Sequence, residues 1–251
     1  MTGSVKKKEI PISKERSPIR TETGHIPRIV SDRNIRDICH YRAQYDGSIR
    51  YVDDALKRFL TGVESEKLLE NTVVIITADH GEMLGEHNSY FRHVAIYEEC
   101  LLVPLIVYSP AMFTNSETVS TMVSLVDIVP TVLNMAGGDL PYYIQGKSLL
   151  PLMHGEDVTH HKYVYAAARD WITVRSEEWK LMRKKSHYTL YNIKEDPKET
   201  RDQMYKRTDI YKEMKNVMRD HNNLSYRRQG DSIPVLDERQ REILRSLGYM
   251  E

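Results

Sequence analysis

Residues 73–87 read VVIITADHGEMLGEH, and this stretch is the one that decides the fold. Its short β-branched run at 73–76 is typical of a strand buried on both faces in the parallel sheet of an α/β protein. Asp79 and His80 then lie just past the carboxyl end of that strand, where open α/β sheets bind ligands. A carboxylate beside an imidazole, with Gly81 freeing the next backbone step, indicates a divalent-metal corner. The alternative is a turn-forming Asp and a surface His.

Five segments, in order, resemble the sulfatase family of the alkaline-phosphatase-like superfamily. Residues 77–87, followed by YEECLLVPLIV at 97–107, are similar to the metal-binding segment of that family. The likeness extends over about residues 35–250. The other segments are similar to a helix before the metal strand, a later helix with its loop, a C-terminal hairpin and a closing helix: HYRAQYDGSIRYVDDALKRFL (40–60), SLVDIVPTVLNMAG (124–137) with QGKSLLPLMHGE (145–156), TVRSEEWKLMRKKSHYTLYNIKEDPKETRDQ (173–203) and ILRSLGY (243–249).

The resemblance implies an α/β fold with two structured parts. We expect part of an alkaline-phosphatase-like sheet with flanking helices, followed by a small C-terminal antiparallel sheet with helices. The predicted divisions are an irregular segment over 1–33, the C-terminal part of the sulfatase α/β core over 34–160, and an α+β subdomain over 161–251.

Apolar periodicity predicts the individual elements. Steps of three and four from Ile38 to Phe59 indicate an amphipathic helix that packs on the sheet. The run LLVPLIV (101–107) predicts a second buried strand, with either a strand start after Pro104 or a bulge there. Farther along, YVYAA, WITVR, WKLMR and TLYNI are strand-length runs between short turns, which indicates an antiparallel sheet. Two helices, at about 202–221 and 236–247, complete the expected elements.

The nucleophile motif of the resembled family has no counterpart in this sequence. Sulfatases carry an N-terminal Cys/Ser-x-Pro/Ala-x-Arg motif whose Cys or Ser becomes formylglycine. Cys39 is followed by His-Tyr-Arg-Ala and Cys100 by Leu-Leu-Val-Pro, so neither fits. The family's paired N-terminal Asp ligands and its Pro-His-x-Pro loop are also missing. We therefore expect this chain to correspond to the C-terminal half of a sulfatase and to be inactive by itself, with an N-terminal half as its missing partner.

The resemblance assigns roles to four residues. Asp79 is the expected metal ligand, and the family pattern favours Ca²⁺, with Mg²⁺ or Mn²⁺ as alternatives. Because imidazole is an unusual calcium ligand, His80 is either a second metal ligand or a contact to sulfate. His93 stands where the family has a Lys or His that contacts sulfate or the leaving oxygen, and it suits a general acid. Arg92 is the alternative, as a substrate-binding group that could not donate its proton.

Composition excludes several other functions. Lys plus Arg and Asp plus Glu are both 36, so neither nucleic acid nor an anionic membrane is an expected partner. Mean hydropathy is −0.54 and no apolar run is long enough for a membrane helix. The first residues, MTGSVKKKEI, do not form a secretory signal, although relatives in the family are often periplasmic, secreted or lysosomal.

The sequence therefore predicts a metal-dependent sulfuric ester hydrolase that cleaves a sulfated small molecule or glycan. One alternative is a phosphomonoester or phosphodiester hydrolase of the same superfamily, because Asp-His-Gly after a strand also occurs there. The YEE and DPKET elements favour the sulfatase. The other alternative is a non-catalytic, truncated sulfatase remnant.

Overall fold

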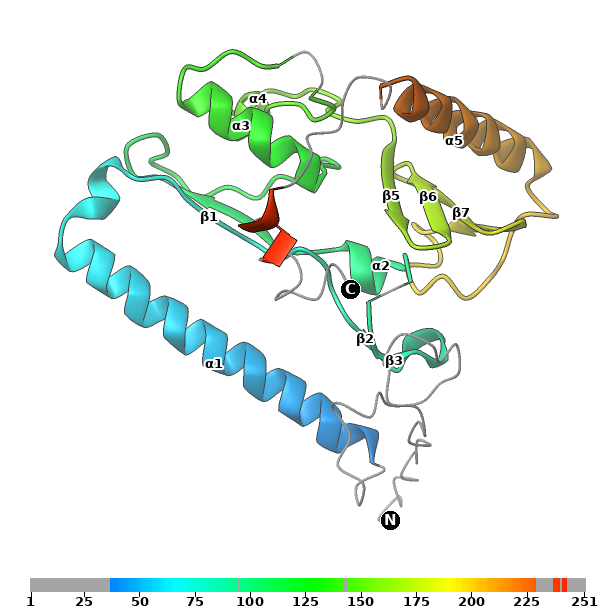
Figure 1. Ribbon diagram of the computed structural model, residues 1–251, viewed down its shortest axis with the longest axis horizontal. Helices are drawn as coiled ribbons and strands as arrows, with labels where there is room; N and C mark the ends of the chain where they lie inside the picture. Colours follow the sequence, from blue (N-terminus) through cyan, green and yellow to red (C-terminus); the bar gives the residue numbers. More distant parts are fainter. Residues whose placement is uncertain (1–36, 94, 142–143, 229–236, 240, 243–251) are drawn as a thin grey trace.

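The computed structural model describes residues 37–93, 95–141, 144–228, 237–239 and 241–242. In these ranges an N-terminal region built around a long helix is joined to a C-terminal antiparallel sheet (Figure 1). None of the described helices has the length and apolar character that a bilayer-spanning segment needs. The helices are α1 (Ile38–Ser65), α2 (Glu98–Leu101), α3 (Ile128–Met135), α4 (Leu150–Met153) and α5 (Thr208–Arg228), with 3₁₀ turns η1 (Leu68–Asn71), η2 (Glu86–Asn88) and η3 (Leu125–Asp127).

The strand predicted at 73–76 forms as β1 (Val74–Thr77) and pairs with β4 (Leu105–Tyr108). This pairing is antiparallel, with Ile75 opposite Val107, so the parallel arrangement that we expected is wrong. Burial on both faces is also wrong for both strands: no side chain of β1 is fully buried, alternate side chains of β4 are open, and Ile106 is 54% exposed. A β-branched run favours a strand, but it does not fix the direction of the partner strand or what covers each face.

Helix α1 confirms the amphipathic helix, but its predicted packing on the sheet is wrong. Figure 1 shows α1 running beside β1 without packing along it. Only its first turns are anchored, where Ile38 and Tyr41 pack on Tyr90 of β3 (Tyr90–Arg92). Farther along, Val52 and Phe59 are more than half exposed. Periodicity shows which residues share a helix face, whereas the element that covers this face depends on tertiary structure.

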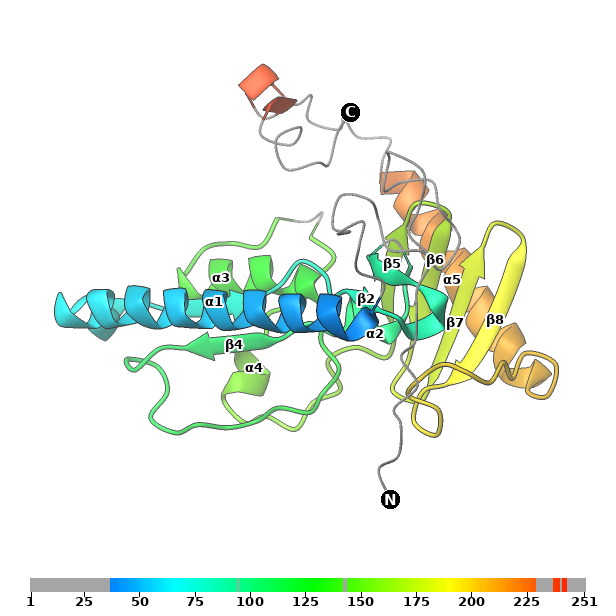
Figure 2. The ribbon, with the colours of Figure 1, turned by 90° about the horizontal axis from the view of Figure 1, so that it is seen from below.

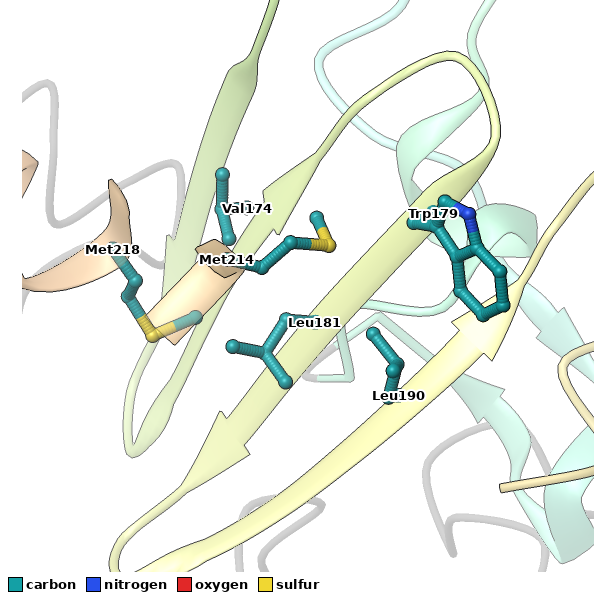
Figure 3. Packing of buried hydrophobic residues seen from close by; sticks show 6 residues of the cluster. All are labelled: Val174, Trp179, Leu181, Leu190, Met214 and Met218. Atoms are coloured by element: carbon teal, nitrogen blue, oxygen red, sulfur yellow. The ribbon is translucent and has the colours of Figure 1, made fainter. Parts of the chain in front are cut away.

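The predicted C-terminal sheet is confirmed as four antiparallel strands in sequence order: β5 (Val164–Ala168), β6 (Trp171–Arg175), β7 (Trp179–Lys184) and β8 (His187–Asn192). Figure 2 shows α5 along this sheet. Side chains alternate across a strand, so one face of the sheet carries the core against α5. Figure 3 shows that core, which consists of Val174, Trp179, Leu181, Leu190, Met214 and Met218.

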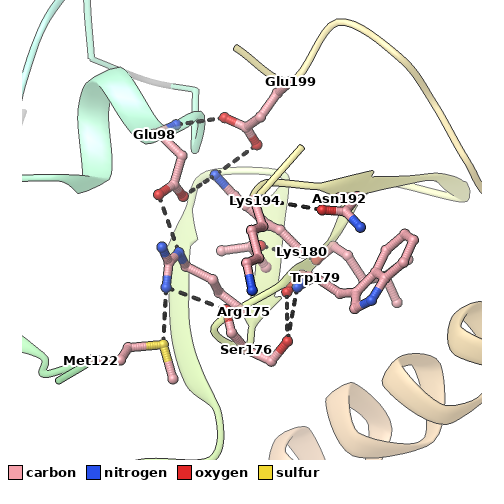
Figure 4. A network of polar contacts seen from close by, with 11 residues as sticks. Glu98, Met122, Arg175, Ser176, Trp179, Lys180, Asn192, Lys194 and Glu199 are labelled. Atoms are coloured by element: carbon pink, nitrogen blue, oxygen red, sulfur yellow. Dashed lines mark hydrogen bonds and ion pairs between the residues drawn. The ribbon is translucent and has the colours of Figure 1, made fainter. Parts of the chain in front are cut away.

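The opposite face of the same sheet carries a buried ion network that holds α2 (Figure 4). Lys180, which is 0% exposed, places its Nζ 2.8 Å from Glu98 Oε1 and 2.9 Å from Glu199 Oε1. Arg175 Nε donates to Glu98 Oε2 at 3.1 Å, and the backbone N–H of Glu98 donates to Glu199 Oε2 at 2.7 Å. Ile96 packs on this face with Met182. The network therefore connects α2, the sheet and the loop around Glu199.

The other predicted elements are either confirmed or lie outside the described residues. β4 starts directly after Pro104 as predicted, and η3 with α3 confirms the helix at 124–137. α5 confirms a helix after residue 202, although it begins at Thr208. The irregular segment at 1–33 lies outside the described residues, and most of the helix expected at 236–247 does too. The division into 34–160 and 161–251 stays a prediction.

Replacing Lys180 with Met should destabilise the fold strongly. This change removes the one ammonium between Glu98 and Glu199 and leaves two carboxylates buried beside each other. Breaking one partner out of a buried ion pair costs about 3–5 kcal/mol in the free energy of unfolding. Urea denaturation measures the change. Lys185→Met on the next turn is the matched control and should cost less than about 1 kcal/mol, because its side chain is 72% exposed. Equal losses of unfolding free energy in both variants would contradict the stabilising role of the buried Lys180 ion pairs.

Candidate functional site

The loop after β1 is fixed by its close contact with α2. The backbone N–H of Gly81 donates to the carbonyl of Cys100 at 2.8 Å. A Cβ at Gly81 would collide with the backbone carbonyl of Glu99, so only glycine fits there without a shift. The close approach of the two backbones explains why a glycine follows Asp79 and His80. It also fixes the position of this loop relative to α2.

Asp79 and His80 form a local pair, as the sequence predicts. Asp79 Oδ1 accepts the backbone N–H of His80 at 2.9 Å, and Asp79 Oδ2 lies 3.6 Å from His80 Nε2. His80 Nδ1 lies 2.9 Å from the carbonyl of Gly81. Because a carbonyl only accepts, Nδ1 is the donor in this contact and carries a proton. The Asp79 carboxylate is 65% exposed, so an ion can reach it from solvent.

His93, which directly follows β3, also contacts this pair. Its ring stacks on the ring of His80, with centroids 4.1 Å apart and an angle of 19° between the planes. His93 Nδ1 is 3.7 Å from Glu82 Oε2. Burial, and then the charge of His80, lower the pKa of His93 below its usual value. Burial raises the pKa of Glu82. The structure therefore brings three of the four predicted residues together.

Arg92 is placed next to this group by β3. It is the last residue of that strand, half-buried and paired with Met83 in the short hairpin. Its backbone carbonyl accepts a contact from Cys100 Sγ at 3.8 Å. Arg169 in the β5–β6 turn adds another positive charge, close enough to lower the pKa of His93 further. Arg169, which was not expected from sequence, therefore acts on the histidine pair, whereas Arg92 is placed near it by its backbone.

The donors at this loop fit two positions of a metal site. Oδ2 of Asp79 and Nε2 of His80 are separated by a distance that one ion could bridge. A calcium ion takes six to eight oxygen ligands, so these two side chains cannot complete its shell. Within the described residues, Asp79 and His80 belong to neither of the two groups of three metal-type side chains. These two side chains could therefore supply only part of a metal site.

One of those two groups lies beside α2 and was missed from sequence: His87, Glu99 and Glu199. His87 stacks on Tyr97 at 3.6 Å between centroids, and its Nε2 is 3.8 Å from Glu99 Oε2. Burial lowers the pKa of His87. The ammonium of Lys180 already supplies a cation to Glu199, which disfavours a metal here. We interpret this group as structural support for α2.

The second missed group is Asp127 with His160 and His161. Asp127 lies in the segment that the sequence identified only as a helix, and the two histidines precede β5. The only sequence signal was the adjacent pair of histidines in a chain that has ten.

Sequence comparison relates the chain to sulfatases. The sequence profile of the sulfatase family matches residues 6–138, which is more than half of the chain. A second profile, N-sulphoglucosamine sulphohydrolase C-terminal, matches residues 85–226. An N-acetylglucosamine-6-O-sulfatase of Bacteroides thetaiotaomicron is 31% identical over 193 residues, 71% of this chain and 34% of that protein. Arylsulfatase K of Canis lupus familiaris is 38% identical over 127 residues, 51% of this chain and 23% of that protein.

Solved structures give the same relationship. A 2-O GAG sulfatase superposes with a TM-score of 0.70 and 25% identity, over 83% of this chain and 48% of that one. A phosphonate monoester hydrolase of Agrobacterium radiobacter reaches a TM-score of 0.63 at 21% identity, over 74% and 42%, which relates the fold alone. The chain thus spans about a third or less of these curated relatives and under half of these solved chains.

Gly81→Ala should destabilise the chain and displace the Asp79 loop. The added methyl group overlaps the backbone of Glu99, and relief of such an overlap costs about 1–3 kcal/mol. Gly47→Ala is the control, because nothing lies within 4 Å of a Cβ at this position in α1. Alanine in a helix interior should stabilise by about 0.5–1 kcal/mol. Thermal unfolding of both variants measures the difference, and a Gly81→Ala variant as stable as Gly47→Ala would refute the close approach.

Proposed function

The chain belongs to the sulfatase family, and from this premise we propose that its Asp79 loop is one part of a metal-dependent centre that hydrolyses sulfate monoesters. One observation carries the proposal: His93, distant in sequence, stacks on His80, whose imidazole Nε2 lies 3.6 Å from the Asp79 carboxylate. A carboxylate and two imidazoles in contact provide both a metal-binding edge and a proton-carrying edge.

Family membership suggests a divalent metal at this loop, and we propose Ca²⁺. The exposed carboxylate of Asp79 is the hard oxygen ligand that such an ion prefers. When bound, the ion would act as a Lewis acid on a sulfate oxygen, an effect worth several kcal/mol in related chemistry. His80 would complete the edge in one of two ways. Its Nε2 either binds the ion beside Asp79 or donates a hydrogen bond to the sulfate after taking up a proton.

His93 is our candidate for the general acid. Its side chain is 52% exposed and lies at the outer edge of the stacked pair, where a leaving oxygen can approach. Burial lowers the pKa of His93, so the free protein carries less of the protonated form than an ordinary histidine would at the same pH. An anionic sulfate ester beside the ring would raise the pKa again and restore the proton when the substrate is present.

Arg92 is the proposed sulfate-binding residue. A guanidinium stays protonated and offers a planar pair of donors that matches two sulfate oxygens. It directly precedes His93 at the end of β3, and the proposal requires both side chains to reach the same ester group. In this arrangement Arg92 orients the substrate and His93 moves the proton.

A sulfated glycan is the proposed substrate. The relatives described above include an N-acetylglucosamine-6-O-sulfatase and a 2-O GAG sulfatase. The phosphonate monoester hydrolases among the solved structures are similar to this chain in fold alone and do not favour the phosphohydrolase alternative. A non-catalytic remnant remains the second alternative, because neither cysteine matches the formylglycine motif.

Asp79→Asn should weaken Ca²⁺ binding by at least about 10-fold, since loss even of a group that supports a metal ligand costs about 10–100-fold. Calorimetric titration of the chain with Ca²⁺ measures this. Asp157→Asn, at an exposed carboxylate in a distant loop, is the control and should bind as the unmodified chain does. His80→Gln distinguishes the two roles of His80: a ligand loses metal affinity, whereas a sulfate contact loses affinity for inorganic sulfate only. An Asp79→Asn variant with unchanged Ca²⁺ affinity would rule out the metal edge.

Turnover by the 251-residue chain itself should be negligible, because its sequence holds no formylglycine motif. The assay compares 4-nitrophenyl sulfate with the phosphate monoester and a phosphate diester, in the presence of Ca²⁺. Robust cleavage of the sulfate would refute the proposal that the nucleophile lies outside this chain. Preferential cleavage of either phosphate ester would instead support the phosphohydrolase alternative.

A further inference from the structure

A second cluster of metal-type ligands lies away from the Asp79 loop, where α3 meets the segment before β5. The carboxylate of Asp127 is fully buried, and two imidazoles approach it from neighbouring residues. His161 Nε2 lies 2.9 Å from both Asp127 oxygens. His160 Nε2 lies 3.3 Å from Asp127 Oδ2. The three ligand atoms are all within 4.8 Å of one another.

The carboxylate is held in a fixed position by the backbone. Ser124 donates its N–H to Oδ2 at 2.8 Å, and Lys147 donates its N–H to Oδ1 at 2.8 Å. Each oxygen has two lone pairs, and the backbone takes one on each, which leaves the other for the side the two imidazoles approach. Gly146 makes the approach of Lys147 possible, because a Cβ at Gly146 would collide with the backbone of Val126. The site is therefore built before any ion arrives.

His160 supplies an independent sign of a ligand. Its side chain is only 4% exposed, and within the described residues its Nε2 makes no hydrogen bond although it is directed at Asp127. A buried polar atom without a hydrogen bond is uncommon in folded proteins and calls for an explanation. Burial lowers the pKa of His160, and the Asp127 carboxylate opposes this effect.

We propose that Asp127, His160 and His161 bind a divalent transition-metal ion, and that Zn²⁺ is the best match. Two imidazoles and one carboxylate are a ligand set that zinc accepts, at metal–ligand distances of about 2.0–2.2 Å. Ligands around a tetrahedral ion of that size stand about 3.3 Å apart, close to the 2.9–3.3 Å seen here. Nitrogen ligands favour Zn²⁺ over Ca²⁺. Binding would replace the Nε2–H contact of His161 with a metal bond, and the ring would keep its proton on Nδ1.

A neighbouring cavity would give an ion access to this cluster, and the bound ion would have a structural role. His161 also lines an open cavity of about 340 Å³ between the segment before β5 and α5, from which water could supply the fourth ligand. The Lys147 ammonium is fixed on the backbone carbonyl of His160, at 2.6 Å, rather than on the carboxylate. An ion bound here would fasten the start of α3 to the start of the C-terminal sheet.

The test is titration of the whole chain with Zn²⁺ in the presence of excess Ca²⁺, which occupies the Asp79 loop. We expect one equivalent of Zn²⁺ to bind, as calorimetry measures, and to raise the melting temperature. His160→Gln and His161→Gln should each weaken this binding at least about 100-fold. His154→Gln and His87→Gln are matched controls: His154 is an exposed histidine in the same region, and His87 belongs to the other candidate group. Both controls should bind as the unmodified chain does.

A readout on the unmodified protein guards against variants that fail to fold. In ¹⁵N-edited spectra of the histidine rings, Zn²⁺ should shift Nε2 of two imidazoles, which the spectra of the variants assign to His160 and His161. Co²⁺ in place of Zn²⁺ should give visible absorption typical of nitrogen and oxygen ligands. Undiminished Zn²⁺ binding in the folded His160→Gln and His161→Gln variants, or unshifted resonances in the unmodified chain, would overturn the proposal.

Discussion

The buried ammonium of Lys180 is the interaction on which the rest of this structure depends. It lies between Glu98 of α2 and Glu199 of the loop after β8, at 2.8 and 2.9 Å. α2 in turn holds the backbone of Gly81 through the carbonyl of Cys100. The ion pair between Lys180 and Glu98 thus fixes α2, and α2 fixes the Asp79 loop. In this chain the candidate site is positioned from the C-terminal sheet.

The network is balanced in charge, and this balance makes it tolerable in the interior. Lys180 and Arg175 face Glu98 and Glu199, so two positive groups meet two negative ones. Burial raises the pKa of Glu199, and the ammonium opposes that effect. Buried ion pairs contribute little net stability relative to apolar residues, but they accept only one arrangement of their partners. The ion pairs act on the four-residue helix α2 together with the apolar packing of Ile96 and Leu101 on the same sheet face, and these contacts determine where it lies.

Sequence reasoning was accurate where the signal is local. The alternation in WITVR and WKLMR predicted strands because the pattern of two residues per repeat belongs to the strand itself. The pairing of Asp79 with His80 was predictable because the two are neighbours. The direction of strand pairing and the identity of the partner strand were not predictable, because the β-branched run of β1 is equally compatible with a parallel or an antiparallel neighbour. Lys180 was also missed, since a lysine in an alternating strand normally faces solvent. The contact of Asp127 with His160 spans 33 positions, and no local pattern encodes it.

The two parts of the chain differ in how completely they cover their apolar side chains, and this difference determines how the site is supported. The C-terminal sheet has a core on one face against α5 and the ion network with Ile96 on the other. The β1–β4 pair leaves Ile106 and Tyr108 exposed, and α1 leaves Val52 and Phe59 exposed. Local stability follows buried apolar contact, so β1 should open more readily than β7. Asp79 nevertheless keeps its place, because the loop is tied to α2 after the strand has ended. The proposed metal-binding edge is therefore fixed by its contact with α2. The exposed strand β1 leads the chain to this loop but does little to hold it in place.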